Sequence, residues 1–217
     1  MSIRNSEIII YEARRKREEN SIFTIGHSNH SFEHFIQLLQ KQAIDVLVDV
    51  RSQPYSRYAT HFSKKALKAG IKQAGMMYLF LGQELGGRPN GDSFYDQDGY
   101  VFYDRVAEAD FFLEGIERLQ RGIKKYRVAM MCSEENPTGC HRHLLVGRVL
   151  TERGCTVLHI RGDGQVQTNE QLKRLQRGKS HRGIVQFALF ELEEEEKEWK
   201  STVSVLPKKQ PNSSLDD

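Results

Sequence analysis

The stretch that decides the fold runs from Tyr126 to Arg148 and reads YRVAMMCSEENPTGCHRHLLVGR. Residues 127–131 form a short apolar run bounded by polar residues, which predicts a buried strand. Residues 133–139 contain asparagine, proline and glycine, which are strong turn formers. From about residue 140, leucine and valine recur at helical spacing. The stretch is therefore predicted to be a strand, a loop and a helix.

Chemically reactive side chains gather in this loop. In open α/β sheets, ligands bind beside the carboxyl ends of the strands, and the following helix offers unpaired N–H groups to an anion. This place contains Cys132, Glu134, Cys140, His141 and Arg142. A thiolate with a lowered pKa is a good nucleophile, and a carboxylate or imidazole can act as general acid or base. We therefore predict catalytic roles for Cys132, Glu134, Cys140 and His141.

The composition limits the class of protein. The 217 residues suffice for one α/β domain with a sizeable core and tails. A formal net charge of +3 permits a phosphate or nucleic-acid partner without demanding one. Three cysteines are too few for a disulfide scaffold. Because we find neither a secretory signal nor a membrane-spanning apolar run, we expect a cytoplasmic protein that does not act in a membrane.

Predicted strands and helices alternate along the rest of the chain. Strands are expected at 21–25, 44–50, 76–81 and 155–160, and helices at 32–42, 63–75, 168–177 and 184–199, with a mostly helical stretch at 100–125. This alternation is typical of a parallel sheet with helices on both faces. We predict a single α/β domain over residues 21–200, a three-layer sandwich around a mainly parallel sheet of about five strands. We expect a charged extension over residues 1–20 and a disordered polar tail over 201–217.

Polar residues also follow the other predicted strands, at the same edge of the sheet. Arginine can hold a carboxylate or phosphate by two hydrogen bonds, and paired glycines let the backbone approach a ligand. The structural alternatives are that Asp49 pairs with Arg51 and that His27 is an ordinary polar turn residue. The predicted substrate-binding residues are His27, Ser28, Arg51, Ser56, Arg57, Gly86, Gly87, Arg88 and Arg142. Their shared location indicates a site more strongly than any one of them.

Several short motifs occur together in one order. They are TIGHS at 24–28, DVR at 49–51, PYSR at 54–57, Phe62, LGG at 85–87, CSEENPTGCHR at 132–142, and His159 with Ile160. With these motifs the chain resembles the domain of unknown function 488 family, over most of its length. The resemblance implies an α/β sandwich and marks these residues as the site. It does not bring a settled reaction.

A second resemblance, to rhodanese-type sulfurtransferases, concerns chemistry. Those enzymes place an Asp-Val-Arg segment after an early strand and a nucleophilic cysteine at a strand end, as Asp49–Arg51 and Cys132 do here. A rhodanese loop reaches an arginine soon after the cysteine, whereas Arg142 lies much further along. Glu134 and Glu135 also add negative charge. The resemblance is therefore an analogy of fold, which does not fix function.

Three functions remain open from the sequence. The first is a cysteine-dependent transferase or hydrolase acting on an anionic substrate that contains phosphate or sulfur. The second is a module that binds nucleic acid or a phosphorylated small molecule without thiol chemistry. The third is a metal site of Cys132, Glu134, Cys140 and His141, whose ligand types suit zinc or iron although the cysteine spacing is unfamiliar. We expect no resident metal or cofactor, and the oligomeric state stays open.

Overall fold

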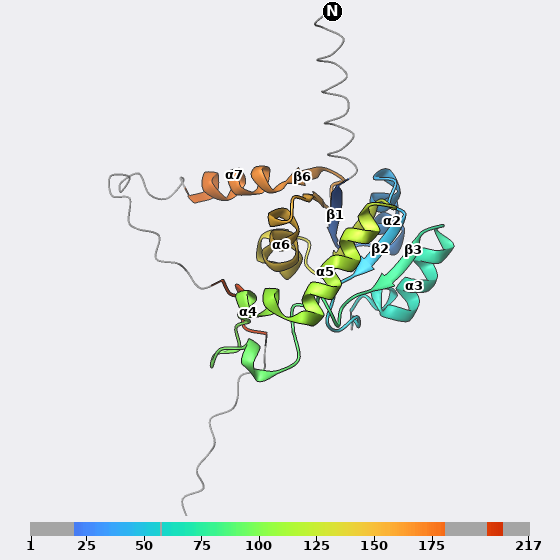
Figure 1. Cartoon of the computed structure of the whole chain (residues 1–217). Coiled ribbons are helices and arrows are strands. Elements are labelled where there is room, and N and C mark those ends of the chain that lie inside the picture. The colour runs from blue at the N-terminus through green and yellow to red at the C-terminus, as the bar shows by residue number, and fades with distance from the viewer. Residues whose placement is uncertain (1–19, 57, 181–198, 206–217) are drawn as a thin grey trace, which may run out of the picture.

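The computed structural model describes residues 20–56, 58–180 and 199–205 (Figure 1). The extension expected at the N-terminus therefore lies outside the described residues, apart from Asn20. Arg57, nearly all of the helix expected at 184–199, and the tail after Val205 also lie outside them. None of the described helices has both the length and the apolar character needed to cross a membrane.

A six-stranded sheet with the order β3-β2-β4-β1-β5-β6 forms the centre of the molecule. The strands are β1 (Ser21–Gly26), β2 (Val46–Asp49), β3 (Met77–Phe80), β4 (Val128–Cys132), β5 (Thr156–Ile160) and β6 (Val166–Thr168). Strands β1 to β5 are parallel, and β6 pairs antiparallel with β5. The predicted mainly parallel α/β sheet is confirmed. The additional strand, β6, is a half-buried edge of only three residues, too short to show a periodic pattern.

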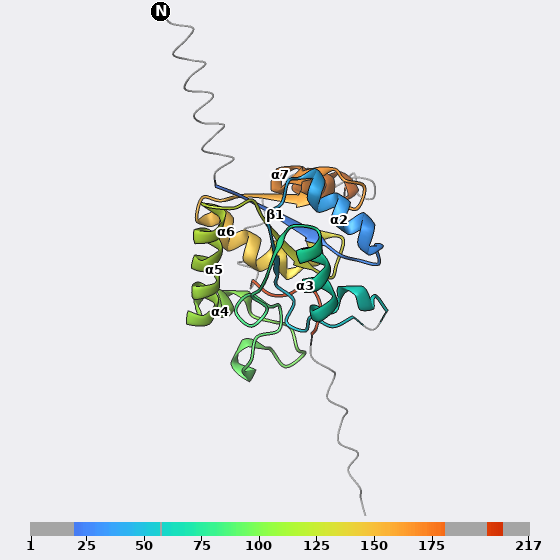
Figure 2. The ribbon, with the colours of Figure 1, turned by 90° about the vertical axis from the view of Figure 1, so that its right-hand side faces the viewer.

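Helices cover both faces of this sheet (Figure 2). They are α2 (Phe32–Lys41), α3 (Lys64–Gln73), α4 (Tyr103–Glu108), α5 (Asp110–Ile123), α6 (Arg148–Glu152) and α7 (Asn169–Ser180). A π-helical segment, η4 (Arg142–Gly147), precedes α6. Short 3-10 turns are η1 (Thr60–Phe62), η2 (Asp92–Phe94) and η3 (Pro137–Gly139).

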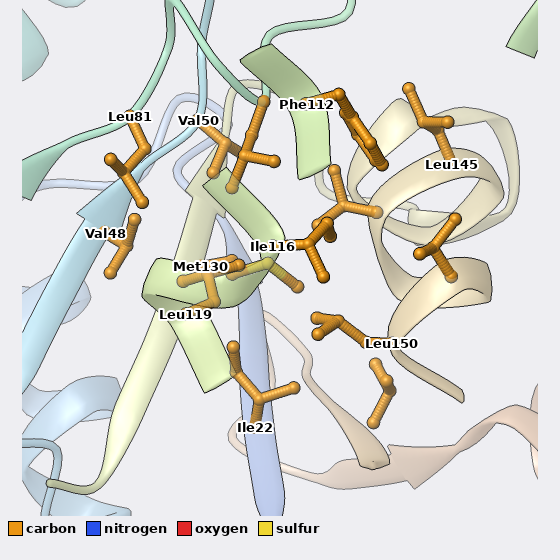
Figure 3. Close-up of a cluster of buried hydrophobic side chains, with 14 of the residues drawn as sticks. Ile22, Val48, Val50, Leu81, Phe112, Ile116, Leu119, Met130, Leu145 and Leu150 are labelled. Carbon is orange, nitrogen blue, oxygen red and sulfur yellow. The ribbon is translucent and has the colours of Figure 1, made fainter. Parts of the chain in front are cut away.

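Two apolar clusters hold the three layers together. One joins the sheet to α5 and α6 and includes Ile22, Met130 and Ile116 (Figure 3). The other joins the opposite face of the sheet to α2 and α3 and includes Phe23 and Phe35. Successive residues of a strand point to opposite faces, so Ile22 and Phe23 of β1 serve different clusters. The alternation of apolar residues in β1 therefore produces the sandwich.

The connections after β1 and β4 leave the sheet in opposite directions. From β1 the chain passes through α2 to β2, on the far side of β4, whereas from β4 it passes through α6 to β5, on the far side of β1. In the register of the two strands, Gly26 pairs with Cys132. Such a reversal between neighbouring parallel strands opens a crevice where ligands bind in α/β folds. The fold thus places Cys132 at this crevice.

The segment Trp199–Val205 packs beside α4, where it is drawn in red (Figure 1). The N–H of Tyr103 donates to the carbonyl of Trp199 at 2.7 Å, and the N–H of Ser201 donates to the carbonyl of Val101 at 2.9 Å. The side chain of Ser201 is buried. Residues 201–205 belong to the stretch that the sequence assigns to a polar tail, yet here they form one wall beside the crevice.

Candidate functional site

Two thiols and one imidazole meet at the end of β4. Cys132 is the last residue of the strand, and Cys140 and His141 follow the turn η3. His141 Nδ1 lies 3.7 Å from the sulfur of Cys132 and 3.8 Å from the sulfur of Cys140. The two sulfurs and this nitrogen all lie within 4.8 Å of one another. The turn-forming loop thus returns the chain to its start and brings together three of the four predicted catalytic residues.

The backbone fixes the orientation of the His141 ring. Its Nε2 lies 3.0 Å from the carbonyl oxygen of Val50, which can only accept, so Nε2 carries a proton. In the neutral ring, Nδ1 is then an acceptor directed at the thiols. A Cβ on Gly87 would lie 2.8 Å from the ring's Cγ, so the bare backbone of Gly87 packs against the imidazole. Burial lowers the pKa of His141, but the Cys140 sulfur and the Val50 carbonyl outweigh it and raise the pKa overall.

The two thiols differ in protonation. The hydrogen bond from Cys140 lowers the pKa of Cys132, and the charge of Arg142 and the N–H of Ser133 act in the same direction, against the effect of burial. Burial and the neighbouring Cys132 sulfur raise the pKa of Cys140 well above its ordinary value. Of the two thiols, Cys132 has the lower pKa and is therefore the one that ionises first.

Cys132 lines a cavity of about 330 Å³. Its walls come from the loops after β2 and β4, the glycine loop after β3, the start of α4 and the segment Trp199–Val205. Besides Cys132, the polar and charged residues in these walls are Arg51, Ser52, Gln53, Tyr55, Arg88, Tyr103, Ser133, Glu134, His141, Ser201 and Ser204. Both thiols belong to the same buried apolar cluster, Cys132 at 6 % and Cys140 at 1 % exposure, and Cys140 does not line the cavity. A ligand in the cavity therefore meets Cys132 before Cys140.

Arg51 is buried and bonded within the protein. Its Nε and one terminal nitrogen donate to the two oxygens of Asp49 at 2.9 and 2.7 Å. The same terminal nitrogen donates to the carbonyl of Phe62 at 2.8 Å, and the other lies 3.1 Å from His27 Nε2. The structural alternative considered from the sequence, an Asp49–Arg51 pair, is thus present. Arg51 reaches the cavity wall with most of its donors already engaged.

Arg142 holds the loop that follows Cys132. The guanidinium is 1 % exposed and donates to the carbonyls of Glu134 and Glu135, the latter at 2.7 Å. Its Nε donates to the hydroxyl of Thr24 at 3.3 Å. Arg142 is therefore outside the cavity wall, and its charge acts on the Cys132 sulfur through the protein.

Comparison with known proteins gives the family of this chain. The family model described as "Domain of unknown function DUF488" matches residues 31–149, which include both thiols, His141 and Arg142. The chain belongs to the DUF488 family. The resemblance found in the sequence is thereby confirmed. No curated protein matches the chain, and no solved structure matches it.

In this DUF488 protein, His27 and Ser28 support the site from the loop that follows β1. His27 Nδ1 donates to the carbonyl of Ser28 at 2.7 Å, so its Nε2 accepts from Arg51. The ring stacks on Phe62 with centroids 4.4 Å apart. Burial lowers the pKa of His27 to about 4, and the charge of Arg51 adds to this effect. The N–H of Ser28 donates to the carbonyl of Ser133 at 2.8 Å, which ties β1 to the reactive loop.

The remaining predicted residues of the DUF488 chain separate into two groups. Glu134 and Arg88 are exposed at the cavity wall, where each can meet a ligand. Ser56 accepts a hydrogen bond from the N–H of Ala59 at 3.0 Å, which is a local turn contact. Gly86 packs its backbone against Ser52. Gly86 and Gly87 thus both support the walls of the cavity.

Sequence reasoning missed Tyr103 and the segment Trp199–Val205 as parts of the site. Tyr103 is 3 % exposed and lines the cavity, and burial together with Cys140 and Glu134 raises the pKa of its hydroxyl. In the sequence it belongs to an aromatic-rich helical stretch, a pattern that usually indicates core. The helix α4 begins only at Tyr103, with Phe102 as its extended N-cap, and no periodic signal reports this start within the stretch expected to be mostly helical.

Cys132, Cys140 and His141 could also hold a metal ion. Among the described residues, the group of converging ligand atoms contains these three but not Glu134. Tetrahedral zinc, with bonds of about 2.3 Å to sulfur and about 2.0 Å to nitrogen, places its ligand atoms roughly 3.5–3.8 Å apart. The sulfur–nitrogen distances of 3.7 and 3.8 Å fit this geometry. The bond from Nε2 to Val50 is of the kind that orients a metal-binding histidine.

Proposed function

We propose that this DUF488 protein is a cysteine-dependent enzyme in which Cys132 attacks a small anionic substrate that contains phosphate or sulfur. One observation carries the proposal. The sulfur of Cys132 faces a cavity of about 330 Å³ and lies 3.7 Å from an imidazole nitrogen whose lone pair is free to accept its proton. A nucleophile beside a base that a third group orients is the general arrangement of covalent catalysis.

Each neighbour of the Cys132 sulfur has a defined role in this proposal. His141 Nδ1 takes the thiol proton and can return it to the departing group. Arg142 supplies a buried positive charge that favours the thiolate, and the N–H of Ser133 donates to it. Tyr103 lines the same cavity, and its hydroxyl is a group that could donate to a substrate oxygen.

The charges around the cavity favour a small anion over nucleic acid. Arg88 is exposed at the wall and Arg51 reaches it, so positive charge is available at close range. Arg51 and Arg142 are both buried and bonded internally, so neither forms part of an exposed basic surface. Glu134 at the wall repels a polyanion. A bound phosphate or thiosulfate fits this balance better than an extended nucleic-acid backbone, which is usually bound by several exposed cations.

The reactivity of Cys132 tests the proposal without knowledge of the substrate. The alkylation rate of each cysteine by iodoacetamide would be followed against pH by peptide mass spectrometry. We expect Cys132 to react with an apparent pKa well below the ordinary thiol value of about 8.5. Inorganic phosphate or thiosulfate should slow this reaction, and Cys155→Ser should leave it unchanged, because Cys155 lies at the opposite end of the sheet. An ordinary or unreactive thiol at Cys132 would overturn the proposal.

A metal site is the second candidate, because the sulfur–nitrogen distances match tetrahedral zinc. Metal analysis of protein purified without an affinity tag distinguishes the two. One zinc or iron per chain, lost in both Cys132→Ser and Cys140→Ser, would make the thiolates ligands and exclude Cys132 as a free nucleophile. Metal-free protein whose Cys132 shows the expected reactivity would support the enzyme.

A further inference from the structure

We propose that Cys140 is a resolving cysteine, and that the substrate of this DUF488 protein is a small anionic disulfide or persulfide. In this cycle Cys132 takes a sulfur-bonded group from the substrate. Cys140 then attacks the Cys132 sulfur and releases that group, which leaves a Cys132–Cys140 disulfide. The proposal rests on the nucleophilic role of Cys132 argued above and narrows its substrate class from phosphate or sulfur to sulfur.

The position of the shared imidazole supports a role for both thiols. His141 Nδ1 is 3.7 Å from one sulfur and 3.8 Å from the other, and the two sulfurs lie within 4.8 Å of each other. One acceptor at almost equal distance from two donors can take a proton from each in turn. A site that used Cys132 alone would need only the first of these contacts.

The exposure of the two thiols sets their order. Both thiols are buried in the apolar cluster beneath α5 and α6, but Cys132 is 6 % exposed and lines the cavity, whereas Cys140 is 1 % exposed and does not line it. A substrate can therefore reach Cys132, and the group that Cys140 can reach is the sulfur of Cys132. This arrangement is of no use to a phosphorylated cysteine, because attack by Cys140 would move the phosphoryl group into the core. It suits a mixed disulfide, whose inner sulfur Cys140 can attack directly.

The chain around Cys140 allows the required approach. A disulfide needs its sulfurs about 2.05 Å apart, so the two residues must move together. Cys132 is held in the middle of the sheet by pairing of β4 with β1 and β2. Cys140 lies between the exposed Gly139 and the π-helical segment η4, and such irregular turns occur frequently at functional sites. Closure therefore moves Cys140 toward Cys132.

The chemical steps balance without a metal or cofactor. The Cys132 thiolate attacks R–S–S–R′, forms Cys132–S–S–R and releases R′–S⁻. His141 Nδ1 takes the Cys140 proton, and the resulting thiolate attacks the Cys132 sulfur and releases R–S⁻. The two departing thiolates take up the two protons that the cysteines lost. The cysteines are oxidised, the substrate is reduced, and a small dithiol restores both thiols by exchange.

The test uses the full chain, reduced and then freed of reductant, with oxidised glutathione as an anionic disulfide probe. In the wild-type protein we expect both glutathione thiols to be released and a Cys132–Cys140 disulfide to appear in the peptide map. Cys140→Ser should release only one thiol and keep a stable glutathione adduct on Cys132. Cys132→Ser should not react, and Cys155→Ser should behave like the wild type. Circular dichroism checks that each variant is folded.

The outcomes separate this inference from the function on which it rests. If the wild-type protein also stops at the Cys132 adduct, Cys140 does not resolve it, and the nucleophilic role of Cys132 survives. If Cys132 forms no adduct in either the wild-type protein or Cys140→Ser, the nucleophilic proposal fails as well. If Cys132→Ser acquires an adduct on Cys140 at the wild-type rate, the order of the two thiols is overturned.

Discussion

His27 and His141 lie at the same edge of the sheet, but their hydrogen-bond partners give them different roles. Both nitrogens of His27 are engaged, one donating to the Ser28 carbonyl at 2.7 Å and the other accepting from Arg51 at 3.1 Å. Only Nε2 of His141 is held by the backbone, at 3.0 Å from Val50. Its Nδ1 faces two thiols instead. The His27 imidazole therefore has a structural role, whereas His141 keeps one ring nitrogen available for proton transfer.

The pKa values of the two rings move in opposite directions for physical reasons. Burial lowers the pKa of His27 to about 4, and the nearby Arg51 charge reinforces the effect. Burial acts on His141 in the same sense, but the Cys140 sulfur and the Val50 carbonyl raise its pKa overall. The residue type therefore does not identify the reactive group. The reactive group is instead identified by which ring nitrogen faces the thiols once the fold has formed. Substitutions of His27 and His141 should therefore affect different observables.

The largest effect, on the free energy of unfolding, is expected from Asp49→Asn, which removes the carboxylate that pairs with Arg51 beside His27. The substitution leaves the Arg51 guanidinium charged, 3 % exposed and without its carboxylate. Removing one partner of a buried ion pair costs about 3–5 kcal/mol in the free energy of unfolding, to be measured by urea denaturation. Glu117→Gln is the matched control, because its pair with Arg121 is exposed and should contribute less than about 1 kcal/mol. Equal stability of Asp49→Asn and the wild type would show that Arg51 does not depend on Asp49.

A second experiment exchanges the two histidines for glutamine. The folded-state pKa of His27 is about 4 against an ordinary value of 6.5, so its stability contribution is present above pH 6.5 and lost as the pH falls toward 4. His27→Gln should reduce the stability lost over this window by roughly 3 kcal/mol. His141→Gln should keep that loss but lower the alkylation rate of Cys132 at pH 7 by about 100-fold. If both variants change the pH dependence of stability, or both change the alkylation rate, the proposed difference between His27 and His141 is wrong.

The smallest effect is expected from Gly87→Ala. The added Cβ would lie 2.8 Å from Cγ of His141, so the ring must move and its alignment with the thiols must change. We expect the alkylation rate of Cys132 to fall by roughly tenfold, since misplacement of a catalytic group is costly. Gly122→Ala is the control, because the nearest atom to its added Cβ is a Val128 methyl carbon at 3.9 Å. Equal rates in both variants would show that Gly87 does not position the imidazole.

The sequence by itself determined the α/β class, the parallel sheet, the strand–loop–helix around Cys132 and the family. These features follow from local periodicity and turn chemistry, in which each residue's role depends on close neighbours in the chain. The same local logic brought Cys132, Cys140 and His141 into one loop. It also indicated a shared edge for His27, Arg51 and Arg88.

Only the tertiary structure decided which of these residues are available to a ligand. The hydrogen-bond partners come from distant segments, since Val50 is 91 residues from His141 and Thr24 is 118 residues from Arg142. Such pairings engage the donors of Arg142 and most of those of Arg51. They leave His141 Nδ1 facing the two thiols. The packing of Trp199–Val205 beside α4 is equally remote in sequence. No local pattern encodes these contacts, because they form only when the strands adopt their order in the sheet.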